Sequence, residues 1–217
     1  MNRRLRAAAR AVVLAANKPV ATARARRTLQ DAPRPFRLEI GGLTPRDGWV
    51  ITNVNAVTRN YLDATKPWPV EDGALSRVYA DNVIEHIPLQ GGRTMLAEAY
   101  RCLQPGGVIR IVTPNVRAHV EEYLSGAASV STPLAGFYRG LGLTVEHPVD
   151  LVRIPIGAFG HHTGYVYDLA SLTAELERAG FHDVQPRALN ESPHADLTNI
   201  DQRTAEDGVQ MAVEGTR

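Results

Sequence analysis

Cysteine, long hydrophobic runs and N-terminal acidic residues are all scarce in this chain of 217 residues. The single cysteine, Cys102, cannot form an intramolecular disulfide, so nothing in the sequence points to an oxidising compartment. The apolar stretch 11–16 holds six residues between Arg10 and Lys18, too few for the core of a signal peptide or for a membrane span. We therefore expect a cytoplasmic protein without a transmembrane segment.

The shortage of acidic residues near the N-terminus divides the chain by charge. Residues 1–37 hold ten Lys or Arg against one acid, Asp31, whereas residues 38–217 hold fourteen basic and twenty-two acidic residues. We therefore expect a basic N-terminal arm, residues 1–35, joined to an acidic body, residues 36–217. The length of the chain and its 44% hydrophobic content fit one globular domain in the body.

The arm is expected to form a short helix, since it is rich in alanine and places Arg3, Arg6 and Arg10 at near-helical spacing. Such a helix could pack loosely on the body, or it could contact anionic lipid, nucleic acid or a second copy of the chain. The acidic body argues against nucleic acid, and a homodimer stays open.

Apolar, β-branched runs alternate with helical patterns along the body. Strands are expected at 36–41, 48–54, 61–63, 76–80, 108–113, 181–189 and 209–214. Helices are expected at 93–103, 116–124 and 168–179, and the rest of 115–160 reads as an irregular insertion. This rhythm predicts an α/β fold: a doubly wound, mostly parallel seven-stranded sheet with helices on both faces and a terminal antiparallel hairpin. Cys102 falls in an apolar helical pattern, which indicates a buried structural thiol.

A dinucleotide-binding fingerprint is also missing. Gly41 and Gly42 follow the first expected strand, but they lack the Gly-x-Gly-x-x-Gly spacing, which disfavours a dinucleotide ligand. Three short signals are present instead, at 38–42, 81–87 and 103–111. Each adjoins an apolar run, so their polar residues and glycines fall at strand ends, where open α/β sheets bind ligands.

The three signals, in this order, resemble the class I S-adenosylmethionine-dependent methyltransferases. They are most similar to a small branch that reads "EH" after the fourth strand and "LKPGG" before the fifth. The resemblance covers about residues 36–217, and it implies S-adenosylmethionine as cofactor and methyl transfer to a small molecule as activity.

The resemblance also implies which residues contact the cofactor. Glu39, Gly41 and Gly42 match the loop under its methionine part. Asn53 and Val54 stand where most relatives use an acid to bind both ribose hydroxyls, so weaker cofactor binding is one consequence. The remaining implied contacts, with the adenine and near the sulfonium, are Asp63, Ala64, Asp81, Asn82 and His86.

Four histidines lie in or beside the implied cleft, namely His86, His147, His161 and His162. A hydroxyl acceptor needs a base, so their number favours oxygen as the methyl acceptor. His161 is the first choice for this base and His147 the second, although either could be a hydrogen-bonded structural histidine. By resemblance, Glu85 and His86 lie near the transferred methyl group.

A divalent ion such as Mg²⁺ could assist, together with substrate hydroxyls. Its candidate ligands are Asp81, Glu85, His86 and Glu146, but their spacing does not demonstrate a site. The insertion at 115–160 is expected to form the floor and lid of the acceptor site. Aromatic and planar groups suited to sugar hydroxyls are Tyr123, Tyr138, Arg139 and Arg153 in this insertion, with Trp68 and Tyr165 outside it.

We therefore expect methyl transfer to a hydroxyl of a small acceptor, most simply a sugar or oligosaccharide. The chain looks similar to the sugar O-methyltransferases of methylated-polysaccharide assembly, including those that act on a mannoside. One alternative is methylation of another small molecule or a lipid headgroup. Another is a non-catalytic partner or binding protein, with a basic arm on a degenerate methyltransferase fold.

Overall fold

The computed structural model describes residues 3–55, 60–125, 132–201 and 209–217, with side chains from residue 12 onward. The strands are β1 (Phe36–Ile40), β2 (Trp49–Thr52), β3 (Leu75–Asp81), β4 (Leu103–Pro114), β5 (His182–Arg187) and β6 (Gln210–Thr216). The α-helices are α1 (Arg3–Asp31), α2 (Leu89–Cys102), α3 (Val116–Leu124), α4 (Pro133–Gly140), α5 (Asp150–Gly157) and α6 (Leu169–Arg178). Three short 3₁₀ helices are η1 (Ile84–His86), η2 (His161–Thr163) and η3 (Ala195–Leu197).

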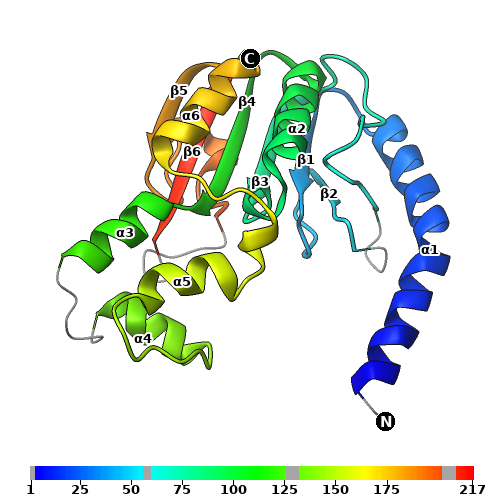
Figure 1. Ribbon diagram of the computed structural model, residues 1–217. Coiled ribbons are helices and arrows are strands. Elements are labelled where there is room, and N and C mark those ends of the chain that lie inside the picture. Colours follow the sequence, from blue (N-terminus) through cyan, green and yellow to red (C-terminus); the bar gives the residue numbers. More distant parts are fainter. Residues whose placement is uncertain (1–2, 56–59, 126–131, 202–208) are drawn as a thin grey trace.

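The strands form one mixed sheet in the order β2-β1-β3-β4-β6-β5 (Figure 1). The first four strands in this order run parallel, and β6 is antiparallel to both β4 and β5. The expected α/β sheet with a terminal antiparallel hairpin is therefore present. The chain steps from β1 to β2 on one side and then to β3 on the other, so the boundary between β1 and β3 is a topological switch point.

The expectation of a seventh strand, at 61–63, is wrong. Tyr61 makes one isolated bridge to Asn53. The chain then turns, because Asp63 Oδ1 accepts hydrogen bonds from the backbone N–H and the hydroxyl of Thr65. The sheet formed by the described part of the chain therefore has six strands.

The two faces of the sheet are covered differently. One face carries the main apolar core, under α2, α6 and the C-terminal end of α1. The other face packs on Leu189, Leu197 and Ile200, and its apolar cluster holds no α-helical residue among those described. The expectation of helices on both faces is therefore wrong for the described chain. The connection from β1 to β2, residues 41–48, is too short to contain a crossover helix.

Residues 188–201 form the segment that covers this second face, and a buried ion cluster joins the segment to the sheet. Arg110 of β4 is fully buried and donates to Asp201 at 2.9 Å and to Glu214 of β6 at 2.7 Å. Its guanidinium also donates to the backbone carbonyls of Ala188 and Glu191. Two carboxylates thus compensate one buried cation. A second bond to Asp201 brings the guanidinium to five hydrogen bonds, all of them with residues 188–201 or with β6.

Helix α1 is longer and better packed than the expected short, loose helix. It runs for 29 residues, and Ala21, Ala25 and Leu29, spaced four apart, are buried against the body. Val12 and Val13 are 68% and 58% exposed, and Figure 1 shows the N-terminal end extending away from the sheet. Among the described helices, α1 included, we find no segment with the length and apolar character needed to span a bilayer.

The segment expected to be irregular, 115–160, is largely helical where it is described. Helix α3 matches the expected helix at 116–124, and α4 and α5 follow it. These two helices share an apolar cluster formed by Leu134, Ala135, Tyr138, Val145, Leu151 and Ile154. Residues 126–131 lie outside the described chain. Figure 1 shows α3, α4 and α5 gathered beyond one end of the sheet.

Candidate active site

The carboxyl ends of β1, β2 and β3 border a pocket of about 470 Å³, which we name the glycine-loop pocket. It lies at the switch point between β1 and β3, where open α/β sheets bind their ligands. Its lining residues are Ile40, Gly41, Asn53, Val54, Leu62, Asp63, Ala64, Thr65, Asn82, Val83, His86 and Ile87. The structure thus brings together most of the residues that the resemblance assigns to the cofactor.

Three of those assigned residues do not line this pocket. Glu39 is 2% exposed and pairs with Arg46 at 3.1 Å. Burial raises the pKa of Glu39, and the Arg46 guanidinium opposes this rise. A Cβ on Gly42 would come 2.5 Å from Glu39 Oε1, so the backbone of Gly42 packs closely against the Glu39 carboxylate. Asp81 accepts a hydrogen bond from the Tyr79 hydroxyl at 3.3 Å.

Asn53 holds the glycine loop to the end of β2. Its Nδ2 donates to the carbonyl oxygens of Gly41 at 2.7 Å and Gly42 at 3.2 Å. Its Oδ1 accepts from the backbone N–H of Asn55 at 2.8 Å. The side-chain donors expected for the ribose are therefore directed at backbone carbonyls, and Asn53 lines the pocket as a brace.

Replacing Asn53 with aspartate introduces the acid that the resemblance predicts at this position, yet we expect it to be harmful. The carboxylate has no N–H to donate, and it would face the carbonyls of Gly41 and Gly42. The free energy of unfolding should fall by about 1–3 kcal/mol. Chemical denaturation measures this loss, with Asn199→Asp on the exposed surface as control. An Asn53→Asp protein as stable as the wild type would show that Asn53 is not a brace.

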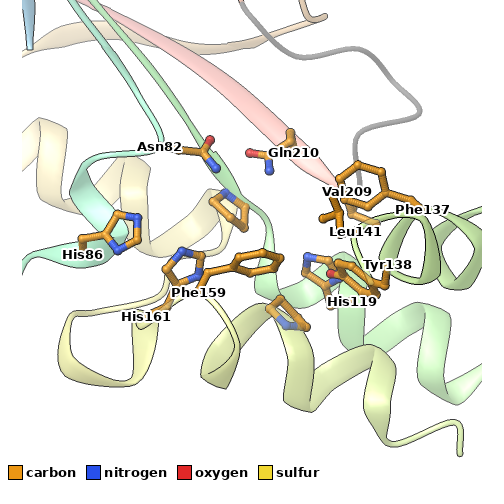
Figure 2. A pocket seen from close by; sticks show the side chains of 12 residues that line it. Asn82, His86, His119, Phe137, Tyr138, Leu141, Phe159, His161, Val209 and Gln210 are labelled. Carbon is orange, nitrogen blue, oxygen red and sulfur yellow. The ribbon is translucent and has the colours of Figure 1, made fainter. Parts of the chain in front are cut away.

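A second pocket of about 550 Å³, which we name the histidine pocket, is shown in Figure 2 and shares Asn82 and His86 with the first. Its walls come from β4, β6, the helices α3, α4 and α5, and the residues in and around η1 and η2. The lining residues are Asn82, His86, Pro114, His119, Phe137, Tyr138, Leu141, Pro155, Phe159, His161, Val209 and Gln210. None of these described lining residues is Asp, Glu, Lys or Arg.

The two pockets meet at Asn82 and His86, which line both. The His86 ring lies edge-on to the His161 ring, with 4.6 Å between centroids. Behind them Glu85 is fully buried, and the Thr113 hydroxyl donates to its Oε2 at 2.9 Å. Glu85 Oε1 lies 3.9 Å from His161 Nε2. A ligand in either pocket can therefore approach a ligand in the other at this junction.

Burial lowers the pKa values of the imidazoles in this region. It lowers the pKa of His86, and burial together with His86 lowers the pKa of His161, partly offset by the backbone carbonyl of Pro155. Burial, followed by the nearby His161, lowers the pKa of His119 to about 4. Neutral imidazoles can accept a proton or a hydrogen bond at neutral pH.

Several buried polar atoms of the histidine pocket have no hydrogen-bond partner in the part of the chain that is described. They are Asn82 Oδ1, His119 Nδ1, His161 Nδ1 and Gln210 Oε1. Buried polar atoms are nearly always paired, and each one left unpaired costs about 1–3 kcal/mol. Their convergence on one pocket is the arrangement expected for a polar ligand.

The other side chains expected to act in the site lie elsewhere, Tyr138 excepted. His147 is exposed and lines neither pocket. Trp68 is buried in the core. The rest of that set is accounted for as follows: Arg139 donates to the Val145 carbonyl, Arg153 pairs with Asp150, and Tyr123 and Tyr165 are partly exposed outside both linings.

Sequence reasoning missed His119 and Gln210. A signal for His119 exists, since a helix that directly follows the carboxyl end of a central strand places its first turn at the ligand edge. No comparable signal marks Gln210, which is one polar residue within the expected strand at 209–214.

Glu85, His86 and His161 could hold a metal ion, since their ligand atoms all lie within 4.8 Å of one another. Asp81 and Glu146, which were also expected as ligands, are not part of this group. Two imidazoles and one carboxylate suit a transition ion better than Mg²⁺, which prefers oxygen ligands. This set of ligands is therefore not typical of the Mg²⁺ site that the sequence left open.

The solved structures to which the chain is similar are distant in sequence. No protein-family model and no curated protein matches it. It is similar to a SAM-dependent methyltransferase from Archaeoglobus fulgidus (17% identity, TM-score 0.48), covering 93% of this chain and 94% of that one. It is also similar to the CurJ carbon methyltransferase (14% identity, TM-score 0.48), covering 87% of this chain and 50% of that one. A third similar structure is a SAM-dependent methyltransferase from Thermotoga maritima (14% identity, TM-score 0.47), covering 91% of this chain and 90% of that one. The chain thus spans half of the CurJ structure, and scores of this size carry no weight in assigning a ligand.

Proposed function

We propose that the chain transfers the methyl group of S-adenosylmethionine to a hydroxyl group of a small acceptor, a sugar or oligosaccharide. The observation that carries this proposal is the pair of pockets that meet at Asn82 and His86 at the switch point of the sheet. One pocket matches the cofactor position of the family that the sequence resembles. The other offers uncharged polar groups beside a possible base.

The glycine-loop pocket fits the cofactor. Gly41 has a φ of +81° and approaches the Val83 side chain so closely that a Cβ would overlap it, which leaves a narrow backbone cradle. Asp63, whose carboxylate Thr65 holds in place, and Ala64 lie on the wall assigned to the adenosine. When bound, S-adenosylmethionine supplies a methyl group already activated as a sulfonium. The protein has to align the acceptor with this group and exclude water.

A hydroxyl acceptor must lose its proton as its oxygen bonds to the methyl carbon, and His161 is placed to take it. The His161 side chain is 3% exposed, burial and His86 lower the pKa of its imidazole, and its Nδ1 has no partner in the described chain. In the proposed reaction His161 Nδ1 accepts the hydroxyl proton, while the adjacent His86 limits how readily that proton is retained. Such a base contributes about a hundred-fold to ten-thousand-fold in rate.

The histidine pocket supports a sugar as acceptor. The rings of Phe137, Tyr138 and Phe159 provide apolar walls, and the neutral polar atoms described above provide hydrogen bonds. Apolar faces combined with a few convergent polar groups are typical of sites for small polar molecules. The absence of a cation from the described lining argues against a phosphorylated acceptor such as a lipid headgroup.

Incubation with methyl-labelled S-adenosylmethionine and a panel of acceptors tests the proposal. The panel holds neutral mannosides and other oligosaccharides, some partly methylated, together with amines, thiols and phosphoethanolamine, and mass spectrometry reads the products. We expect label on a hydroxyl of a neutral saccharide. Label found on amines or phosphorylated compounds alone would contradict the choice of acceptor.

The pH dependence of transfer follows from the environment of His161. A base must be unprotonated, and burial together with His86 places its pKa below the ordinary 6.5 of histidine. We therefore expect the acid limb of the kcat/KM profile to be centred below pH 6.5. A kcat/KM profile between pH 5 and 8 measures this. An acid limb centred above pH 6.5 would contradict His161 as the base.

A further inference from the structure

The histidine pocket extends beyond the junction where transfer takes place. Figure 2 shows His86 and His161 on one side, His119 and Tyr138 on the other, and Phe159 between them. The Phe159 ring lies 5.9 Å from the His161 ring and 6.3 Å from the Tyr138 ring, measured between centroids. A ligand that fills this pocket therefore presents one group to His161 and another group to the far side.

His119 is the polar group of the far side, and nothing in the proposed transfer step uses it. It projects from α3 and is 2% exposed. Its Nδ1 has no partner among the described residues. Helices α3 and α5 pack against each other, and Pro155 of α5 lines the same pocket as His119. A histidine this deeply buried, with an unpartnered ring nitrogen and a place in the lining of a cavity, is suited to bind a ligand in that cavity.

Gln210 at the start of β6 lines the same pocket with a second open acceptor, its Oε1. A carboxamide both donates and accepts, as does a hydroxyl group, whereas a phosphate or carboxylate only accepts. A charged group would also be buried here without a counter-ion in the described lining. A neutral hydroxyl is the group that both side chains can bind.

We infer that His119 and Gln210 form a second binding site within the histidine pocket, for a hydroxyl of the acceptor other than the one methylated. The acceptor is accordingly an uncharged compound with at least two hydroxyl groups, and His119 is a specificity-determining residue. This inference rests on the proposed function, because it takes the histidine pocket as the acceptor pocket.

The test compares His119→Ala with the wild type on a saccharide that the labelled panel identifies, on its singly deoxygenated analogues and on its phosphate ester. We expect His119→Ala to raise KM about tenfold, the worth of one hydrogen bond, with kcat and S-adenosylhomocysteine affinity unchanged. With the wild type, one deoxygenated analogue should show the same tenfold rise in KM. With His119→Ala, that analogue should have the same KM as the full saccharide. The phosphate ester should not be methylated.

Two further variants separate binding from folding. His119→Gln keeps a hydrogen-bonding group and should recover much of the lost affinity, and His182→Ala on exposed β5 should behave as the wild type. If the rise in KM caused by His119→Ala adds to the rise caused by every deoxygenated analogue, the inference is overturned, while the proposed methyl transfer stands. Absence of both cofactor binding and transfer to any acceptor would instead overturn the proposed function, and the inference with it.

Discussion

Replacing Gly41 with valine is expected to raise the dissociation constant for S-adenosylmethionine about 100-fold or more, a loss of about 2.8 kcal/mol. Gly41 has a positive φ, which a β-branched residue adopts only with strain. Its Cβ would also overlap the Val83 side chain, which lines the same pocket. The loop or Val83 must then shift into the space proposed for the cofactor. Isothermal titration calorimetry measures the effect.

Gly106 provides a matched control for this substitution. It has a φ of +74°, and a Cβ there would meet no atom within 4 Å. Gly106→Val should therefore share the backbone strain yet bind the cofactor as the wild type does. Combining Gly41→Val with Val83→Ala should recover part of the affinity, because it removes the overlapping methyl groups. Binding by Gly41→Val as tight as that of the wild type would remove the glycine loop from the cofactor site.

Replacing His161 with alanine is expected to lower kcat on a hydroxyl acceptor by about a hundred-fold to ten-thousand-fold. The substitution removes the neutral imidazole at the junction of the pockets, and nearby His86 is turned edge-on to it. Cofactor affinity should not change, because His161 lines the histidine pocket and not the glycine-loop pocket. Single-turnover kinetics with labelled cofactor, together with calorimetry, measure the two quantities separately.

The neighbouring His162 supplies the control, since it is exposed and lines neither pocket. His162→Ala should keep wild-type turnover. A thiol acceptor, if one is accepted, needs less help from a base and should suffer less from His161→Ala. Unchanged turnover of hydroxyl acceptors by His161→Ala would show that the proton goes elsewhere.

The parts of the fold that depend on local sequence could be predicted. Buried β-branched runs marked β1, β3 and β4, and Asp168 marked the start of α6, where the structure has a capping box with Ser171. Cys102 is buried, as its place in an apolar helical pattern indicated. The predicted strand at 61–63 failed because Asp63 has a local partner, Thr65, that turns the chain.

Helices α4 and α5 were hidden by their composition. Glycines and Pro155 break the apolar pattern, and the two helices gain their stability by packing on each other. A start signal was nevertheless present, because Thr132 caps α4 and Pro133 occupies its first turn. The cover of the second sheet face could not be predicted, since it depends on Arg110 meeting Asp201 across 91 residues.

For the candidate site, sequence reasoning located the strand ends but not the directions of the side chains. Position alone suggested that Asn53 faces the cofactor, whereas its amide nitrogen is turned toward the carbonyls of the glycine loop. His119 was missed because the buried face of α3 is fixed by its packing on α5. Tertiary contacts of this kind leave little trace in a single sequence.

A crystal structure with S-adenosylhomocysteine tests the central claim most directly. The account expects the adenosyl group in the glycine-loop pocket, between Gly41 and Asp63, with the sulfur atom at Asn82 and His86 and directed into the histidine pocket. Well-ordered ligand at another place on the sheet, or a glycine-loop pocket that stays empty at saturating ligand, would contradict it.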